Sequence, residues 1–278
     1  MQLTYERLKK KPQIFLRLTG TTISEFEQIV EKVKPLWEEE IEKQKKLPGR
    51  TSQLKYFEDK LLVLLMYYRT YITHEFIGYL VGLHNANICR LFKKLEPLVA
   101  KKITIKKDRS LTQEEVIKIL ADVTEQPTQR PKKNSKQKKH YSGKKKRHTL
   151  KAEIVMQDNG RILSTSRTRP GRTHDFRIRK EGKPLPGNSE NYVDSGYQGL
   201  QKIANNVTLP FKRRKNKPLT DEQKRHNKEL AFIRTRVENK IREIKTFKIM
   251  SETYRNFQRK HNLRFNIIAG VVNLKHAF

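Results

Sequence analysis

Apolar residues recur at helical spacing through the first third of the chain. In residues 20–46 they lie one turn apart and predict an amphipathic helix, which Pro35 should kink or divide because proline lacks a backbone N–H. Residues 54–69 are more uniformly apolar and predict a second helix. This part of the chain is therefore expected to be all-α.

The stretch after the second helix has the pattern of a helix-turn-helix. A short helix is predicted from about 73 to 81, then a turn at Gly82 and a further helix that Asn85 can cap. Pro97 should end that helix. An ordinary helical hairpin with a solvated basic face explains the same pattern. In the helix-turn-helix interpretation, the polar face of the second helix offers residue types that reach bases and phosphates: Asn87, Arg90, Lys93 and Lys94.

From residue 117 the hydrophobic period changes to two. Residues 117–123, 150–156 and 161–168 alternate like strands, and Asp158-Asn159-Gly160 is a hairpin-turn sequence, so we expect an antiparallel meander. The run between the first two strands, residues 130–151, is very basic, contains no acid and predicts a loop. A disordered polar segment fits the same composition.

The later segments alternate between short strands and helices. Strands are predicted at 192–194 and 207–211, a long helix at 220–248 and an amphipathic helix at 254–274. Together with the meander they predict a mixed α/β sheet. The expected organisation is an N-terminal helical segment at 1–48, a helix-turn-helix domain at 49–112 and an α/β domain at 113–278.

Positive charge narrows the class of partner. Lys and Arg number 62 against 29 Asp and Glu, for a net charge of +33, and a polyanion such as nucleic acid would relieve the resulting self-repulsion. No apolar run approaches the roughly 20 residues of a membrane-spanning helix, and no signal peptide is visible. A cytoplasmic protein is therefore expected, associated with the nucleoid when bound to DNA. The single Cys89 excludes an intramolecular disulfide and a cysteine-based zinc finger.

Three carboxylates stand out against this charge. Asp122 and Asp194 end apolar, strand-like runs, and Glu238 lies at the margin of the apolar face of the long helix. Carboxylates from different rigid elements are the ligands with which Mg²⁺ acts on phosphodiesters. The same residues also have ordinary interpretations: each aspartate can cap a turn, and Glu238 can join a surface ladder with Arg234, Arg242 and Lys245.

The surrounding motifs narrow this choice. They are, in order, Ala121-Asp122-Val123-Thr124, Tyr141-Ser142-Gly143-Lys144-Lys145-Lys146-Arg147-His148, Pro170-Gly171-Arg172-Thr173-His174-Asp175, Asp194-Ser195-Gly196-Tyr197-Gln198-Gly199 and Arg236-Val237-Glu238. In this combination, over about residues 117 to 250, the chain resembles the DDE transposases of bacterial insertion sequences, in the branch similar to the insertion-sequence-five and Harbinger families. Residues 50–98 resemble the helix-turn-helix that precedes this domain.

The resemblance implies a ribonuclease H-like catalytic fold in which Asp122, Asp194 and Glu238 hold two Mg²⁺ or Mn²⁺ ions. It implies cleavage of double-stranded DNA at terminal inverted repeats, then strand transfer into target DNA, by a homodimer or higher oligomer. Val123 stands where the family often has glycine. His174 and Asp175 match a motif with a possible accessory role, and a helix cap explains that pair equally well.

Further basic residues are expected to hold DNA near the metals. They are Lys144, Lys145, Lys146 and Arg147 in the basic run, and Arg234 and Arg242 on the long helix. An alternative function is a transposase-derived DNA-binding protein or regulator without catalysis. An RNA- or ribosome-associated protein is a third interpretation, which the scarcity of glycine-aromatic RNA-binding motifs disfavours.

Overall fold

The computed structural model describes residues 3–44, 53–105, 118–182, 184–185, 189–213 and 218–276. The chain forms two compact units. Unit 1 comprises Met1–Thr104, Ile244–Glu252 and Arg259–Phe278, and unit 2 comprises Ile105–Glu243 and Thr253–Gln258. The domain borders expected near residues 48 and 112 lie outside the described residues. The C-terminal segment, expected in the α/β domain, is divided between the two units.

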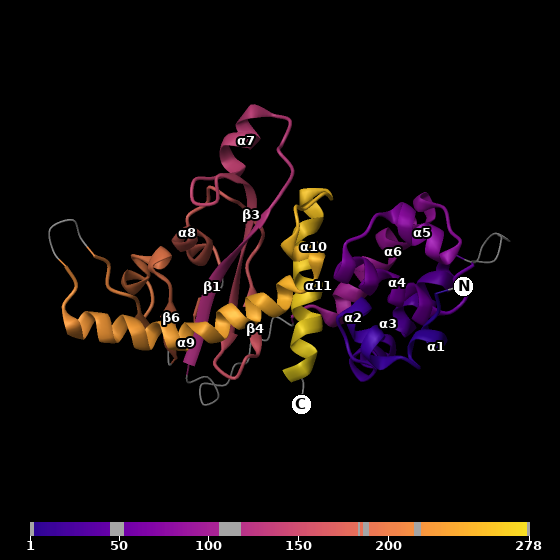
Figure 1. The fold of residues 1–278 in the computed structure, drawn as a ribbon, viewed down its shortest axis with the longest axis horizontal. Helices are drawn as coiled ribbons and strands as arrows, with labels where there is room; N and C mark the ends of the chain where they lie inside the picture. The colour runs from indigo at the N-terminus through magenta and orange to yellow at the C-terminus, as the bar shows by residue number, and fades with distance from the viewer. Residues whose placement is uncertain are drawn as a thin grey trace. The chain divides into compact units, whose positions relative to one another are not determined.

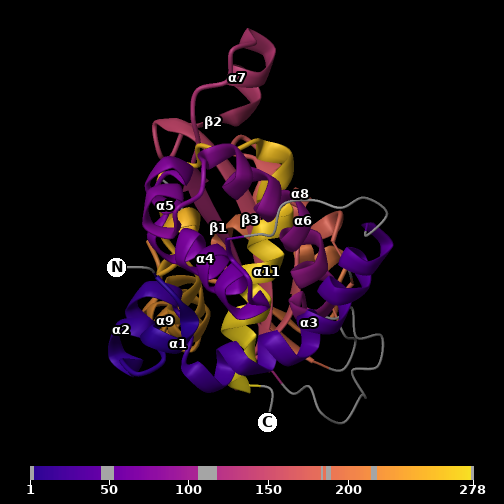
Figure 2. The same cartoon turned by 90° about the vertical axis from the view of Figure 1, so that its right-hand side faces the viewer.

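Unit 1 is a helical bundle around an apolar central helix. In α4, Phe57–Thr70, the residues from Asp59 to Tyr68 are all buried, which explains its uniform apolarity. Figure 2 shows this helix among its neighbours, and α2, α3, α6 and α10 all contact it. The other helices of the bundle are α1 Tyr5–Leu8, α2 Pro12–Thr19, α3 Ile23–Gln44, α5 His74–Val81, α6 Asn85–Ile103, α10 Lys248–Ser251 and α11 His261–Asn273.

Two prolines expected to interrupt helices lie inside them. Helix α3 continues through Pro35, so it is not divided there, and α6 continues through Pro97 to Ile103, so the predicted end at Pro97 is wrong. An interior proline costs about 3 kcal/mol because it removes one backbone hydrogen bond and crowds the preceding turn. Burial of neighbouring apolar residues such as Val33 and Val99 offsets that cost, while both proline rings lie on the exposed side.

The C-terminal helix belongs to the bundle. Helix α11 begins only at His261, after a 3-10 turn at Gln258–Lys260, and it is buried on most sides rather than amphipathic as predicted. Gly270 permits its close approach to α6, because a Cβ at this position would lie 1.5 Å from the carbonyl oxygen of Ile103. Glu96 of α6 is fully buried and accepts hydrogen bonds from Arg264 at 2.7 Å and Lys260 at 2.8 Å.

Unit 2 contains the predicted mixed sheet (Figure 1). Strands β1 Lys118–Pro127, β3 Arg147–Gln157 and β4 Ile162–Thr165 form the antiparallel meander, with its tight turn at residues 158–160. On the other side of β1, β6 Glu190–Val193 and β7 Val207–Thr208 add parallel strands. The strand order is β2-β3-β1-β6-β7, with β4 and β5 paired to β3. A helical region followed by this sheet confirms the predicted fold class, a ribonuclease H-like mixed sheet after an all-α region.

The basic run is more structured than predicted. It contains helix α7, Asn134–His140, and strand β2, Tyr141–Ser142, which pairs with the start of β3, so the prediction of a loop from 130 to 151 is wrong. Short strand β5, Arg169–Pro170, pairs with Leu150 and Lys151, a little farther along β3. Figures 1 and 2 both show α7 standing out beyond the end of the sheet.

The two faces of the sheet have different partners. One face carries an apolar core built on Ile119, Ala121 and Val155, against which the turns η1 Ser195–Tyr197 and η2 Leu200–Lys202 and helix α8 Asp175–Lys180 pack. Because side chains alternate along a strand, Asp122 points to the opposite face from Ala121. Helix α9, Asp221–Lys245, contacts that second face, since its Arg234 lies beside Asp122.

Candidate active site

Strand pairing brings Asp122 and Asp194 together. The parallel register of β1 and β6 ends at the pair Ala121↔Val193, so the two aspartates are the next residues on neighbouring strands. Asp122 itself lies within β1, which continues to Pro127 against β3, and the prediction that it ends its strand is wrong. The site therefore lies where β6 stops and leaves the side of β1 open.

A local backbone donor orients each aspartate. Oδ1 of Asp122 accepts a hydrogen bond from the Val123 N–H at 2.8 Å, and Oδ1 of Asp194 accepts one from the Ser195 N–H at 2.6 Å. Asp194 is also the N-cap residue of η1. The turn-capping interpretation is thus correct for one oxygen of Asp194, and the second oxygen of each carboxylate remains available for another partner.

Helix α9 adds Glu238 and Arg234 to the site. The Arg234 guanidinium lies 3.3 Å from Oδ1 of Asp194, 3.9 Å from Oδ2 of Asp122 and 3.9 Å from Oε1 of Glu238. Side-chain exposure is 15% for Arg234, 19% for Asp122, 33% for Asp194 and 55% for Glu238. The three predicted carboxylates therefore surround one cation, and Arg234 faces them rather than solvent.

Burial changes the chemistry of Asp122. Loss of solvent raises the pKa of Asp122 to about 6, and the nearby carboxylates of Asp194 and Glu238 act in the same direction. The charge of Arg234 and the Val123 N–H oppose this rise. A cation at this position consequently favours the ionised form of Asp122.

The donor set fits hard divalent ions. All three groups supply carboxylate oxygens, which Mg²⁺ and Mn²⁺ prefer, and all three are directed at one point that already holds positive charge. Among the described residues, no three His, Cys, Asp or Glu side chains lie close enough together to form a ready-made metal site. Arg234 lies between the three carboxylates.

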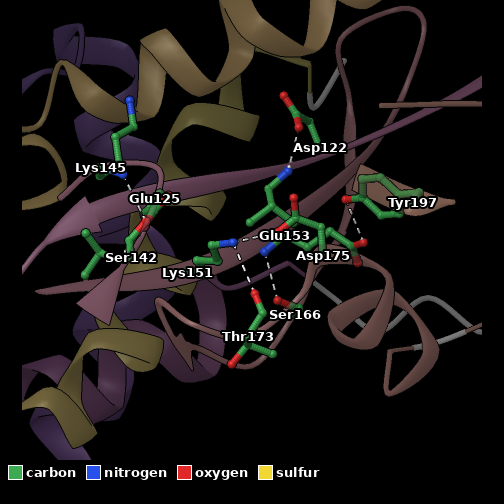
Figure 3. A network of polar contacts seen from close by, with 12 residues as sticks. Asp122, Glu125, Ser142, Lys145, Lys151, Glu153, Ser166, Thr173, Asp175 and Tyr197 are labelled. Carbon is green, nitrogen blue, oxygen red and sulfur yellow. Dashed lines mark hydrogen bonds and ion pairs between the residues drawn. The ribbon is translucent and has the colours of Figure 1, made fainter. Parts of the chain in front are cut away.

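A second polar cluster lies on the opposite face of the sheet (Figure 3). Its centre is Glu153 of β3, one residue from the cross-strand partner of Asp122 and only 1% exposed. Glu153 pairs with Arg179 at 2.9 Å and accepts a hydrogen bond from the Tyr197 hydroxyl at 3.0 Å. Burial raises the pKa of Glu153 to about 7, against the charge of Arg179 and the Tyr197 hydrogen bond. Sequence reasoning missed Glu153, although an acid at an inward position of an apolar strand was a signal.

The motif pair His174 and Asp175 joins this second cluster only in part. Asp175 accepts a hydrogen bond from Nζ of Lys151 at 2.9 Å, and in Figure 3 it lies with Lys151 and Glu153 while Asp122 points away. His174 is exposed and is the N-cap residue of α8, without a side-chain capping bond. Its backbone position agrees with the capping alternative, but its imidazole does not perform the cap.

In unit 1 the predicted DNA-reading face is exposed. The side chains of Asn87, Arg90, Lys93 and Lys94 are exposed on α6, and Nη1 of Arg90 donates to Oδ1 of Asn87 at 2.8 Å. Gly82 adopts the left-handed conformation of the predicted turn, with φ of 68°. The cap of α6 is His84, whose Nδ1 accepts from the Ala86 N–H, so the prediction that Asn85 caps this helix is wrong.

In unit 2 basic side chains gather at two places. Lys144, Lys145, Lys146 and Arg147 are all exposed between β2 and β3, and Arg242 is exposed on α9. A cavity of about 490 Å³ is lined by four basic residues and one acid: Lys139 of α7, Arg169 of β5, Arg172 in the turn after β5, Arg177 of α8, and Glu181. The sequence showed these cations but not that they converge, because they come from separate elements.

The chain is similar to known proteins over most of its length. Residues 121–274 match the family described as DDE superfamily endonuclease, and residues 52–105 match the helix-turn-helix of DDE superfamily endonuclease. A probable transposase for insertion sequence element IS702 from Microchaete diplosiphon is 38% identical over 271 residues, covering 95% of this chain and 94% of that protein. A protein from Streptomyces albus G, named for the transposase of insertion sequence element IS112, is 25% identical over 199 residues, covering 70% of this chain and 71% of that protein. No solved structure matches the chain. The predicted resemblance is confirmed: the chain belongs to the DDE superfamily endonucleases and carries their helix-turn-helix DNA-binding region.

Proposed function

We propose that this protein is an insertion-sequence transposase that cuts DNA at terminal inverted repeats and joins the cut ends to target DNA. One observation carries the proposal: Asp122, Asp194 and Glu238, from β1, the end of β6 and α9, surround a single cationic group. The relationship to a probable transposase along nearly the whole chain supports it.

The three carboxylates would hold two Mg²⁺ or Mn²⁺ ions, which when bound supply Lewis acidity at the scissile phosphate. Water attacks the phosphorus, and the bridging 3′ oxygen leaves as a free 3′-hydroxyl. In strand transfer this hydroxyl attacks a phosphodiester of the target and displaces a target 3′-hydroxyl. Each phosphodiester formed replaces one that is broken, so strand transfer needs no external energy source and no covalent protein–DNA intermediate.

The remaining expected residues receive roles in DNA binding. Helix α6, through Asn87, Arg90, Lys93 and Lys94, would read the transposon ends, and Lys144 to Arg147 with Arg242 would hold phosphates near the acidic site. Joining two ends requires two sites, which favours a homodimer or higher oligomer. A chromosomal DNA substrate favours a cytoplasmic protein at the nucleoid. In the described part of the chain, no helix has the length and apolarity to span a bilayer.

The decisive variant is Asp194→Asn, made in the full chain. It should abolish Mg²⁺-dependent cleavage of end DNA, because one carboxylate ligand is lost, and leave binding of the same DNA unchanged. The substrate is the inverted repeat that brackets the reading frame in its genome. Asp158→Asn is a matched control. Asp158 is an aspartate of the same unit, lies in the hairpin turn after β3 and pairs with Arg236 of α9. Normal cleavage by Asp194→Asn would contradict the proposal.

A second candidate function is DNA binding without catalysis, as a regulator derived from a transposase. The position of Arg234 among the three carboxylates favours it, because a permanent guanidinium there would exclude metal. End binding without metal-dependent nicking, by the unmodified chain and over many candidate repeats, would establish this alternative.

A further inference from the structure

Among the described residues, the ionic partners of Arg234 all belong to the acidic site. They are the carboxylates of Asp122, Asp194 and Glu238, and the buried Nε of Arg234 has no hydrogen-bond partner in the same part of the chain. The side chain is only 15% exposed. A cation is thus held in a partly buried place by the charge of three acids rather than by a fitted set of hydrogen bonds.

The distances indicate a loose contact. Paired guanidinium and carboxylate groups usually approach to about 2.7–2.9 Å and often bond in two places at once. Here the separations are 3.3, 3.9 and 3.9 Å, and no carboxylate is gripped in that way. Such a contact neutralises mutual repulsion among the acids, and a more compact and more highly charged cation can replace it.

We propose that Arg234 is a positioning residue that keeps Asp122, Asp194 and Glu238 assembled while metal is absent and competes with divalent cations for them. The inference rests on the proposed metal site. Its physical basis is that a guanidinium and a metal ion cannot occupy the centre of one group of acids, so metal binding must displace Arg234. The long, flexible arginine side chain can turn out of the site without movement of α9.

The direct test is Mn²⁺ affinity without DNA, measured by electron paramagnetic resonance of free Mn²⁺ on the full chain. Arg234→Gln should bind Mn²⁺ about tenfold more tightly than the unmodified protein, because no internal cation has to be displaced. Arg225→Gln is the matched control: it removes the same charge from an exposed position of the same helix, more than two turns from Arg234, and should leave the affinity unchanged. Asp194→Asn should lose the tight site.

Thermal unfolding supplies a second measurement. In EDTA, Arg234→Gln should melt at a lower temperature than the unmodified protein, because three acids lose their counter-charge. Mn²⁺ should raise the melting temperature of Arg234→Gln by more than it raises that of the unmodified protein. Arg234→Lys keeps a charge but loses the planar fork, so it should fold normally and show a smaller gain in Mn²⁺ affinity. This variant keeps the inference testable if Arg234→Gln does not fold.

The outcomes separate the two proposals. The role of Arg234 is overturned, and the metal site stands, if the unmodified protein binds Mn²⁺ through Asp194 and Arg234→Gln binds Mn²⁺ no more tightly than Arg225→Gln. Absence of saturable Mn²⁺ binding in every variant overturns both.

Discussion

His261, at the start of α11, is a buried imidazole that the DNA chemistry does not use. It is 2% exposed and packs beside the ring of Phe265. Burial lowers the pKa of His261 to about 4, and the charge of Arg264 adds to the effect. In the unfolded chain the same group titrates near its ordinary value of about 6.5. Between these two values the unfolded state therefore binds more protons than the folded state.

The resulting prediction concerns stability in mild acid. The contribution of neutral His261 is fully present above pH 6.5 and is lost as the pH falls toward 4, by up to about 3 kcal/mol. Urea unfolding of the unmodified protein and of His261→Gln should therefore diverge in pH dependence between pH 7 and 5. His174→Gln, at an exposed histidine, is the control and should keep the original profile. Parallel curves for all three proteins would contradict the assignment.

At this scale the sequence selected candidate site residues but did not show the surroundings of their side chains. Asp122 and Asp194 could be selected because each follows buried apolar residues, and Glu238 because of its place at the edge of a helix stripe. The position of Arg234 could not be predicted, because its spacing to Glu238 equally describes a surface ladder. Only the register of β1 with β6 brings the two aspartates to the same guanidinium.

Among the elements, α6 and α11 depend on one buried acid. Glu96 is fully buried, and Arg264 and Lys260 both donate to it from the C-terminal part of the chain. Glu96→Ala should destabilise the protein by about 3 to 5 kcal/mol, because it removes the buried carboxylate that balances the charges of Arg264 and Lys260. Equilibrium unfolding in urea measures the loss. Glu39→Ala removes an acid from an exposed pair on α3 and should change the stability little, so equal losses for the two variants would contradict this role of Glu96.

Helix α6 also carries a prediction about DNA. If Lys93 and Lys94 contact phosphates, replacing both with Gln should weaken end binding and reduce the slope of log affinity against log salt by about 2. Lys101→Gln with Lys102→Gln is the matched control, because it removes the same charge from the far end of the same helix. Binding titrations from low to moderate salt give the slopes. An unchanged slope for the Lys93 and Lys94 variant would remove α6 from the DNA interface.

Elements were predicted correctly where an apolar pattern extended over many residues, and wrongly where a single residue was taken to end a helix. The meander followed from its alternating apolar residues, and α4 from its continuous apolar run. Pro97 did not end α6, because buried residues on both sides of it stabilise the helix in the bundle. The run from 130 to 151 was predicted to be a loop because of its high positive charge. It is ordered instead by strand pairing, of β2 with the start of β3 and of Thr149 with Pro127 in β1.

For the whole molecule, the division of the chain matters most. The sequence suggested consecutive domains, but unit 1 combines Met1–Thr104 with two segments after residue 243. Hydrophobic patterning could not reveal this, because an apolar C-terminal helix fits either unit. Two contacts assign α11 to unit 1. Gly270 leaves space for the backbone of α6, and Glu96 of α6 pairs with Arg264 of α11.

This division predicts the behaviour of a fragment. A protein consisting of residues 1–104 should not form a stable bundle, because α6 would expose the apolar surface that α11 covers and Glu96 would lose both cations. Circular dichroism and urea unfolding of the fragment should show a weak, poorly cooperative transition. A fragment that unfolds as cooperatively as the full chain would show that the C-terminal helix is dispensable.

The late position of α11 also has a consequence for synthesis on the ribosome. Roughly 150 residues separate the end of α6 from the start of α11, and at 5–20 residues per second the ribosome needs on the order of ten to thirty seconds to make them. Throughout that interval the emerging helix-turn-helix lacks its last partner, and by its end most of the strands that build the sheet have left the ribosome. The nuclease half can consequently fold first, and the helical half is completed only when the final residues leave the exit tunnel.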